Sequence, residues 1–477
     1  MSYETAVTRM FALGHELAQM PSHKFDLAHM RVLLAALGHP EQRFPSVLIA
    51  GTNGKGSTAA TLSSILQASG LKTGLYTSPH LVRINERIRV GGAEIGDEAF
   101  ASLHGQVDRV AEKLVGRAEL PWHPSFFEMM TAIAFEHFAH EKIDIAVLEV
   151  GMGGRLDATN VVEPRVSVIA DISLDHQKYL GDTLREIARE KAGIIRSGGA
   201  VVTLPQQPEA NDVIGNTILE SGARAINAVP YVPPVSPGSP GYMVGAENHA
   251  GAENHAGADE GLLTAKGAKF AKKDMRKCVS RYPLQVFGEQ ILVESPLVGR
   301  HQLRNVALAI AAAVELNEQG FSSITAKTIA KGIRETRWPG RFQVIPARAG
   351  WPEVVIDAAH NPAGAWALRS ALSERYESRS LIFVFGAMSD KAISEMAEIL
   401  FPLAERVIAA RPVNPRAASP EEIRRASSRT GTEIEAVDDV RQAVERARSL
   451  ASGDAVVVIA GSIYLVGEAM PVIGAKV

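Results

Sequence analysis

A glycine-rich segment near the start of the chain has the residue types that bind phosphate. It reads GTNGKGS (residues 51–57), follows the apolar run Val47–Ala50 and precedes a segment with apolar residues at helical spacing. Glycines let backbone N–H groups converge on phosphate oxygens, and the N-terminus of the following helix adds a favourable dipole. Lys55 can reach the β and γ phosphates, and a hydroxyl group of Ser57 or Thr58 can bind Mg²⁺. The segment predicts a nucleotide-binding loop between a strand and a helix.

This loop departs from the usual Walker pattern at two points. Gly56 stands directly after Lys55, where that pattern has serine or threonine, and Gly51 is closer to the lysine than the first glycine of that pattern. The prediction therefore depends on the order of strand, loop and helix, and a purely structural glycine turn is the alternative.

Three ionisable residues further along the chain lie where a metal site could form. Glu149 ends the buried apolar run Ile143–Val150, and Mg²⁺ prefers such a hard oxygen ligand. His176 follows a second apolar run, Arg165–Ile172, at the same edge of the predicted sheet. Lys191 lies near the end of a predicted helix, a position typical of an exposed cation that complements the helix dipole. From the residues alone, an ion pair for Glu149 and an ordinary hydrogen-bonded histidine stay open as alternatives.

Apolar strand-like runs alternate with segments of helical period over most of the chain. This alternation predicts an α/β protein in which crossover helices connect parallel strands. We predict two domains: a P-loop domain with a mostly parallel sheet over 1–295, and a smaller Rossmann-like α/β domain over 296–477. Order is expected to falter over 205–286, where prolines and the direct repeat GAENHAGAENHA (245–256) indicate a low-complexity insertion at about 228–262.

The composition excludes several classes of protein. Net charge is −3, from 50 basic and 53 acidic residues, which gives no general field for binding nucleic acid or anionic lipid. The single cysteine, Cys278, cannot form an intrachain disulfide, which fits a reducing cytosol. We expect a cytoplasmic protein, because the first residues lack a signal-peptide pattern and the apolar run 455–467 is too short to span a bilayer.

Seven motifs occur in a fixed order along the chain. They are GTNGKGS (51–57), TSPHL (77–81), LEVGMGGRLDATN (148–160), LDHQKYLG (174–181), REKAGI (189–194), WPGRF (338–342) and DAAHNP (357–362). This series resembles the folylpolyglutamate synthase and dihydrofolate synthase family, within the ATP-dependent Mur-type amide ligases. The resemblance covers nearly the whole chain except the stretch 205–286, and it implies that the second domain is a glutamate ligase domain.

The resemblance implies a reaction in two steps. The γ-phosphoryl group of ATP passes to a carboxylate of dihydropteroate or a reduced folate, and the amine of L-glutamate then attacks the acyl phosphate and expels phosphate. The implied partners are these small molecules and Mg²⁺, with no nucleic acid and no membrane, and the expected state is a monomer. Since the reactants before the attack are anionic, the site should be rich in positive groups.

The resemblance also implies a role for particular residues. Contacts to ATP are implied for Thr52, Asn53, Gly54, Lys55, Gly56, Ser57, Asn305, Arg341, Asp357 and His360. Contacts to the pterin substrate are implied for Asp26, Ser125, Leu156, Asp157 and Ala158. Ligation of Mg²⁺ is implied for Ser57, Ser78, Glu149, His176 and Lys191. Direct participation in catalysis is implied for Lys55, His176, Lys191 and Arg341.

Lys191 needs a covalent change before it can ligate a metal ion. An ammonium group would repel Mg²⁺, whereas a carbamate reverses the sign of the charge and supplies oxygen ligands. The matching lysine of the family is carbamylated, so the resemblance implies a carbamate on Lys191.

Two other functions compete with this prediction. A Mur-type peptidoglycan-precursor ligase is the alternative within the class, although Gly56 after the loop lysine favours the folate branch. A regulatory P-loop switch is the alternative outside it, but that function leaves Glu149, His176, Lys191 and the second domain without a role. The sequence does not distinguish an enzyme for the first glutamylation from one that also extends the glutamate chain.

Overall fold

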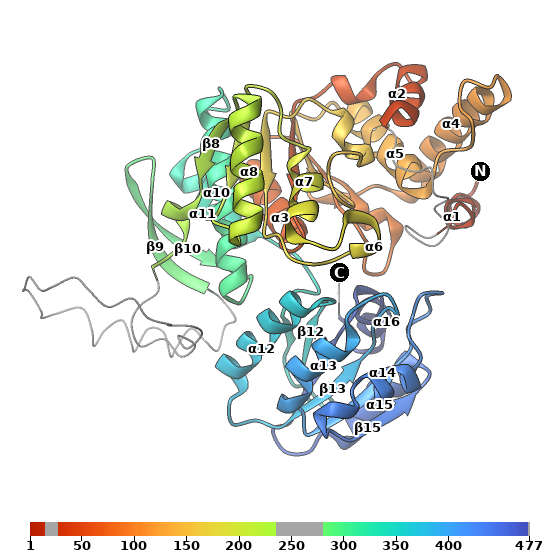
Figure 1. The fold of residues 1–477 in the computed structure, drawn as a ribbon, viewed down its shortest axis with the longest axis vertical. Helices are drawn as coiled ribbons and strands as arrows, with labels where there is room; N and C mark the ends of the chain where they lie inside the picture. Colours follow the sequence, from red (N-terminus) through yellow and green to blue (C-terminus); the bar gives the residue numbers. More distant parts are fainter. Residues whose placement is uncertain (15–26, 235–279, 476–477) are drawn as a thin grey trace, which may run out of the picture.

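The computed structural model describes residues 1–14, 27–234 and 280–475. Two α/β domains lie one above the other, with the N-terminal domain at the top of Figure 1. Both contain mostly parallel sheets, as predicted. Asp26 and the GAENHA repeat lie outside the described residues.

The N-terminal domain is built on an eight-stranded sheet in the order β4-β3-β2-β5-β1-β6-β7-β8. All neighbouring strands are parallel except β2–β3 and β3–β4. The strands are β1 Ser46–Ala50, β2 Thr73–Tyr76, β3 Ile88–Val90, β4 Ala93–Glu94, β5 Ile145–Glu149, β6 Val166–Ile169, β7 Ala200–Thr203 and β8 Arg224–Asn227. Since β1 is central, the loop that follows it lies where open α/β sheets bind ligands.

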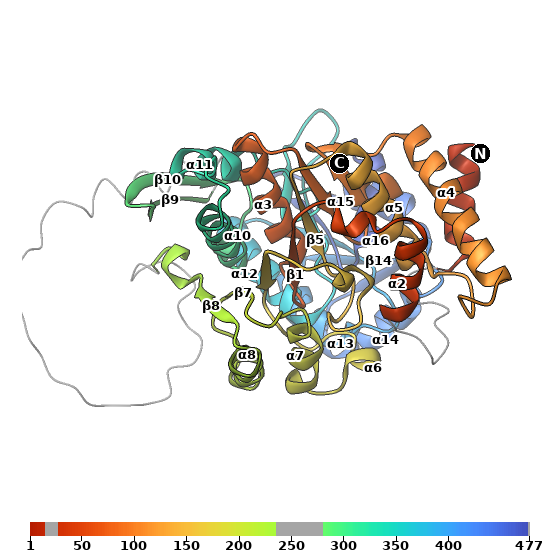
Figure 2. The same ribbon diagram turned by 90° about the horizontal axis from the view of Figure 1, so that it is seen from above.

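Helices cover both faces of this sheet. Along β1, Val47 and Ile49 point into one apolar cluster and Leu48 and Ala50 into the other, as alternation in a doubly buried strand requires. One face carries α3 Lys55–Ala68, α10 Arg300–Glu318 and α11 Ala326–Glu335. The other carries α1 Tyr3–Ala12, α2 Leu27–Ala36, α4 Asp97–Gly116, α5 Phe126–Glu141, α7 Leu184–Ala192 and α8 Pro208–Ser221. Figure 2 shows α3, α10 and α11 together, away from α2, α4 and α5.

The helices α10 and α11 are packed on the N-terminal domain, whereas the predicted division at 295/296 would place them in the second one. Both contact α3, and the hairpin of β9 Ser280–Val286 and β10 Glu289–Ser295 lies beside α11. At Gly332 the approach to α3 is so close that a Cβ atom would lie 2.3 Å from Cα of Ile65. On this packing we propose that the boundary lies between 336 and 340.

The C-terminal domain has a six-stranded sheet in the order β11-β12-β16-β13-β14-β15, parallel except for β11. Its strands are β11 Gln343–Ile345, β12 Glu353–Asp357, β13 Leu381–Phe385, β14 Arg406–Ala410, β15 Ile434–Val437 and β16 Val456–Ala460. One face is covered by α12 Pro362–Tyr376, α13 Ile393–Leu400 and α14 Pro420–Ala426. The other is covered by α15 Val440–Leu450 and α16 Ile463–Val472.

The expectation that order falters over 205–286 is wrong for 208–227 and for 280–286, since the latter residues form β9. Within 208–227, α8 begins with Pro208, packs on α7 and is followed by β8, which extends the sheet. Four apolar residues of α8, Ala210, Val213, Ile214 and Ile218, are buried and supply the stabilising surface. No helix among the described residues is long and apolar enough to cross a membrane.

Candidate active site

A cavity of about 700 Å³ lies at the carboxyl ends of β1, β5 and β6 and continues between the two domains. It is lined by every residue that the sequence analysis assigned to the site, apart from Asp26. These residues are Thr52, Asn53, Gly54, Lys55, Gly56, Ser57, Ser78, Ser125, Glu149, Leu156, Asp157, Ala158, His176, Lys191, Asn305, Arg341, Asp357 and His360. The structure therefore brings the predicted residues together, while the role of each stays a prediction.

The glycine-rich loop is held by the end of the neighbouring strand β6. Backbone N–H groups of Thr52 and Asn53 donate to the carbonyl oxygen of Asp171, at 2.8 and 3.1 Å. Gly54 has φ +86°, and a Cβ atom there would lie 2.1 Å from Oδ1 of Asn305 on α10. Glycine is therefore required at this position by conformation and by space. Lys55 begins α3, so the loop leads directly into a helix N-terminus, as predicted.

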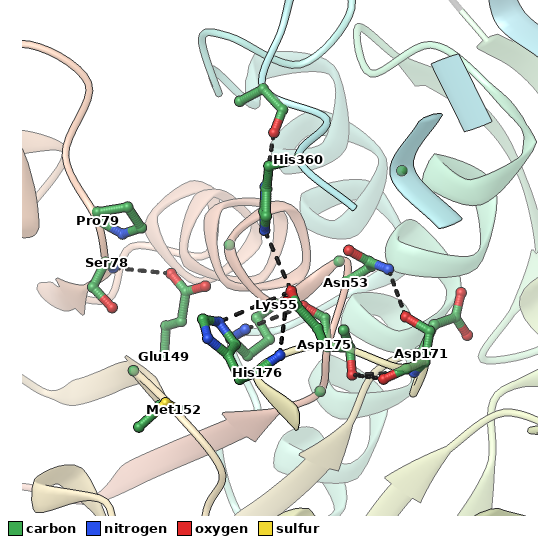
Figure 3. A pocket seen from close by; sticks show the side chains of 18 of the residues that line it. Asn53, Lys55, Ser78, Pro79, Glu149, Met152, Asp171, Asp175, His176 and His360 are labelled. Atoms are coloured by element: carbon green, nitrogen blue, oxygen red, sulfur yellow. Dashed lines mark hydrogen bonds and ion pairs between the residues drawn. The ribbon is translucent and has the colours of Figure 1, made fainter. Parts of the chain in front are cut away.

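The candidate metal ligands of the N-terminal domain lie at neighbouring strand ends (Figure 3). Glu149 ends β5, is buried, and its Oε2 accepts a hydrogen bond from the backbone N–H of Ser78 at 3.1 Å. The hydroxyl-bearing side chain of Ser57 is buried in the first turn of α3. Among the described residues, no group of three His, Cys, Asp or Glu side chains forms a ready metal cage. A cation here would need hydroxyl, phosphate or carbamate oxygens as further ligands.

His176 is a candidate nitrogen ligand for such a cation. Burial, together with the positive charge of Lys391, lowers the pKa of His176 to about 3, despite the opposing charge of Asp175. The imidazole is therefore neutral near pH 7, and its buried Nδ1 has no hydrogen-bond partner among the described residues. This orphaned nitrogen and the nearby carboxylate of Glu149 fit a divalent cation.

Lys191 is not the exposed helix-end cation that its position in the sequence allowed. It is 3% exposed, and its Nζ donates a hydrogen bond of 2.8 Å to the carbonyl oxygen of Gly51. Burial, followed by the charge of Lys55, lowers the pKa of Lys191 to about 7. A buried lysine beside the phosphate loop thus has a large fraction of neutral amine near pH 7.

The C-terminal domain contributes the opposite wall of the cavity. Asp357 ends β12, and its carboxylate accepts backbone N–H groups of Phe342 (2.7 Å) and Ala359 (2.8 Å). These two bonds join the segment that carries Arg341 to the segment that carries His360. The Nδ1 atom of His360 bonds to the carbonyl oxygen of Ala358, which directs Nε2 towards the N-terminal domain (Figure 3).

The wall assigned to the pterin substrate is fixed by internal hydrogen bonds. Ser125 caps α5, and its hydroxyl group donates to Glu128 at 2.7 Å. Glu128 in turn contacts Nδ1 of His29 at 2.9 Å. Asp157 is buried, and its carboxylate accepts N–H groups of Met152 and Thr159 at 3.0 Å each. The carboxylate of Asp157 therefore fixes its own loop, and the surface of that loop faces the cavity.

Sequence reasoning missed several polar residues of this cavity. Asp175 lies within the motif LDHQKYLG beside His176, and the motif by itself gives Asp175 no role. Asn361 lies within DAAHNP, where the sequence likewise indicates no role for it. Lys391 carried no signal at all, since an isolated lysine after β13 is typical of a solvent-exposed loop. All three meet at the domain interface.

A phosphate loop, carboxylates at strand ends and a second α/β domain that completes the cavity define an ATP-dependent ligase of the Mur type. Residues 340–463 match the family model described as Mur ligase, glutamate ligase domain. The chain is 34% identical to the dihydrofolate synthase/folylpolyglutamate synthase of Bacillus subtilis, over 93% of this chain and 94% of that protein. It belongs to the dihydrofolate synthase/folylpolyglutamate synthase family.

Solved structures agree with this assignment. Folylpolyglutamate synthase of Mycobacterium tuberculosis, complexed with ADP and AMPPCP, superposes with a TM-score of 0.78 at 28% identity, covering 99% of both chains. Escherichia coli FolC, in complex with DHPP and ADP, superposes with a TM-score of 0.76 at 28% identity, covering 99% of this chain and 98% of that one.

Proposed function

We propose that this enzyme uses ATP to join L-glutamate to dihydropteroate, to a reduced folate, or to both. The observation that carries the proposal is the continuous cavity, which joins the phosphate loop at Lys55 to the substrate wall at Ser125 and to the glutamate ligase domain at His360. The Bacillus subtilis relative is named for both glutamylation steps, and the Escherichia coli relative binds DHPP and ADP.

The proposed reaction begins with transfer of the γ-phosphoryl group to the substrate carboxylate. Lys55 and Arg341, on opposite walls of the cavity, place two cations where negative charge is transferred. The amine of L-glutamate then attacks the acyl carbon, the C–N bond forms, and the C–O bond to phosphate breaks. The amine loses a proton in this step. Closure of the two domains excludes water, which would otherwise hydrolyse the acyl phosphate.

The N-terminal wall fits a bound Mg²⁺. Its ligands would be Ser57, Ser78, Glu149, His176 and a carbamate on Lys191. The cation would supply electrostatic stabilisation of the phosphate oxygens. The carbamate is supported by the burial of Lys191 beside Gly51, since burial favours the neutral amine, which is the form that can react with carbon dioxide.

An assay of ADP release distinguishes the candidate functions. The proposal predicts ADP release only when both L-glutamate and a pterin acid are present, with dihydropteroate and tetrahydrofolate tested separately. Release that requires a UDP-linked acid would favour the Mur-type peptidoglycan-precursor ligase. ADP release that ignores L-glutamate would contradict the proposed glutamate ligase. The monomeric state is a further proposal, which sedimentation equilibrium tests.

A further inference from the structure

Asp175 is one of the points at which the two domains contact each other beside the phosphate loop; Nδ2 of Asn361 also donates to Oδ1 of Asn53 of that loop, at 3.0 Å. Asp175 follows β6 in the N-terminal domain, yet side chains of the C-terminal domain converge on its carboxylate. Nζ of Lys391 lies 2.5 Å from Oδ1, and Nδ2 of Asn361 lies 3.2 Å from Oδ2. Nε2 of His360 lies 3.6 Å from the same Oδ2. Figure 3 shows His360 pointing at Asp175 from the opposite wall.

These contacts are buried rather than superficial. Asp175 is 8% exposed, and the side chain of Lys391 is 9% exposed. A charge pair in such a position is costly to desolvate, and removal of one partner leaves the other charge buried without compensation. The pair is therefore expected to be far more sensitive to substitution than an exposed ion pair.

The same carboxylate also accepts a hydrogen bond from the backbone of the residue that follows it, His176. Oδ1 of Asp175 accepts the backbone N–H of His176 at 2.8 Å. His176 has φ +51°, a left-handed conformation that non-glycine residues adopt only when their surroundings impose it. Oδ1 of Asp175 thus contacts both the backbone of His176 and Nζ of Lys391 in the C-terminal domain.

We propose that Asp175 is a positioning residue that couples placement of the C-terminal domain to the conformation of His176. Without its charge, Lys391 loses its ionic partner, and only one side-chain oxygen is left to accept hydrogen bonds from Lys391 and Asn361. The C-terminal wall then no longer meets the phosphate loop in one fixed arrangement. The kinetic consequence rests on the proposed ligase reaction, whereas the coupling between the domains does not.

A double-mutant cycle tests the kinetic part. Asp175→Asn keeps the shape of the side chain and removes its charge, and Lys391→Met removes the partner. Each single variant is expected to lower kcat by at least about 10-fold. The double variant should have a kcat no lower than that of the less active single variant, because both substitutions remove the same interaction. KM for ATP should change by a smaller factor than kcat, since the phosphate loop itself is intact and only the contacts implied for the C-terminal wall are displaced. Independent, multiplying losses would overturn the proposal.

A matched control distinguishes loss of the Asp175–Lys391 pair from the general effect of losing an ion pair. Arg446→Met breaks the exposed Arg446–Glu435 pair within the C-terminal domain, where N and O lie 2.8 Å apart. It is expected to leave kcat unchanged. A loss like that of Lys391→Met would overturn the specific role of Asp175.

Hydrogen exchange of the ligand-free protein tests the coupling without any substrate. Asp175→Asn is expected to accelerate amide exchange both in 171–177 of the N-terminal domain and in 357–364 of the C-terminal domain. Acceleration confined to 171–177 would overturn the proposal. If the wild-type protein released no ADP with glutamate and a pterin acid, the proposed function would be wrong. Hydrogen exchange would still test the coupling between the domains, because it needs no substrate.

Discussion

Gly56 of the phosphate loop lies against the indole ring of Trp338. A Cβ atom on Gly56 would be 2.8 Å from Cζ2 of Trp338 and 3.3 Å from Oε2 of Glu149. Trp338 belongs to the linker that joins α11 to the C-terminal domain. The departure from the usual Walker pattern thus has a steric cause, since a serine or threonine at position 56 has no room beside this ring.

Gly56→Ala should therefore impair nucleotide binding although alanine is the better helix former. We expect the dissociation constant for ATP to rise about tenfold or more and the free energy of unfolding to fall by about 1–3 kcal/mol, from overpacking. Calorimetric titration and denaturant unfolding measure the two effects. The control is Gly215→Ala in α8, where a Cβ atom meets nothing within 4 Å, so that stability should stay equal or rise. Equal behaviour of the two variants would contradict the steric explanation.

Arg341→Ala should lower turnover without unfolding either domain. The guanidinium group lines the cavity, and its recorded hydrogen bond, at 3.2 Å, joins Nη1 to the carbonyl oxygen of the neighbouring Gly340. The guanidinium group is therefore positioned to contact a phosphate group in the cavity, and it does not pack in the apolar core. We expect kcat to fall at least about 100-fold, as for other cations that stabilise a transferred phosphoryl group. Thermal unfolding should be unchanged, and Arg341→Lys should recover part of the activity. Unchanged turnover would argue against a contact from this wall.

Helices and strands of this fold can be predicted from the sequence where their burial produces a regular pattern of apolar residues. The strand β13 is predicted at Leu381–Phe385 as observed, because a parallel strand buried on both faces gives a continuous apolar run. The helix α8 is missed because its apolar residues are few and follow a proline-containing segment. Local sequence patterns do not show to which domain α10 and α11 belong, because their place depends on tertiary packing against α3.

The site was predictable where local motifs meet at strand ends, as for Glu149 and His176. The contacts of Asp175 with Lys391 and Asn361 at the domain interface could not be predicted from the sequence. Asp175 and Lys391 are 216 residues apart, and no local pattern links the two residues. The burial of Lys191 was also hidden, since its position near a helix end favours exposure and only the tertiary fold places it under Gly51.

Lys191 should carry a carbamate in the active enzyme. With ¹³C-labelled bicarbonate, a carbamate carbon signal is expected in the wild-type protein and absent in Lys191→Ala. That variant should lose activity by at least about 100-fold, because the cation loses an anionic ligand. Acetate should restore part of the activity, since the space vacated by the side chain can hold a small carboxylate. An intact mass that shows an unmodified lysine in fully active enzyme would contradict the carbamate.

Removal of divalent cations should abolish ADP release. EDTA would remove the cation that His176 and Glu149 are proposed to hold and, with it, the electrostatic stabilisation that this cation would supply to the phosphate oxygens. Added Mg²⁺ should restore the rate, and Glu149→Gln should raise the Mg²⁺ concentration needed for half-maximal rate about 10- to 100-fold. An equal requirement in the wild-type and variant enzymes would exclude Glu149 as a ligand.

Glu128 should make the stability of the N-terminal domain depend on pH in acid. Burial acts to raise the pKa of Glu128, but hydrogen bonds to His29 and Ser125 outweigh it and lower the pKa below its ordinary value of 4.5. Since the folded protein holds the ionised form, this contribution is fully present above pH 4.5 and is lost as pH falls through the lowered pKa. Glu128→Gln should reduce the free energy of unfolding by about 1–3 kcal/mol at pH 7.

The difference between wild type and Glu128→Gln in the free energy of unfolding should then shrink below pH 4.5, as the wild-type carboxyl group becomes protonated. Denaturant unfolding at a series of pH values measures it. The matched control is Glu186→Gln, which alters the same kind of capping box on the exposed surface of α7 without a buried histidine. A difference that stays constant from pH 7 to pH 3 would show that the charge of Glu128 does not stabilise this wall, and that its hydrogen bonds to Ser125 act through shape alone.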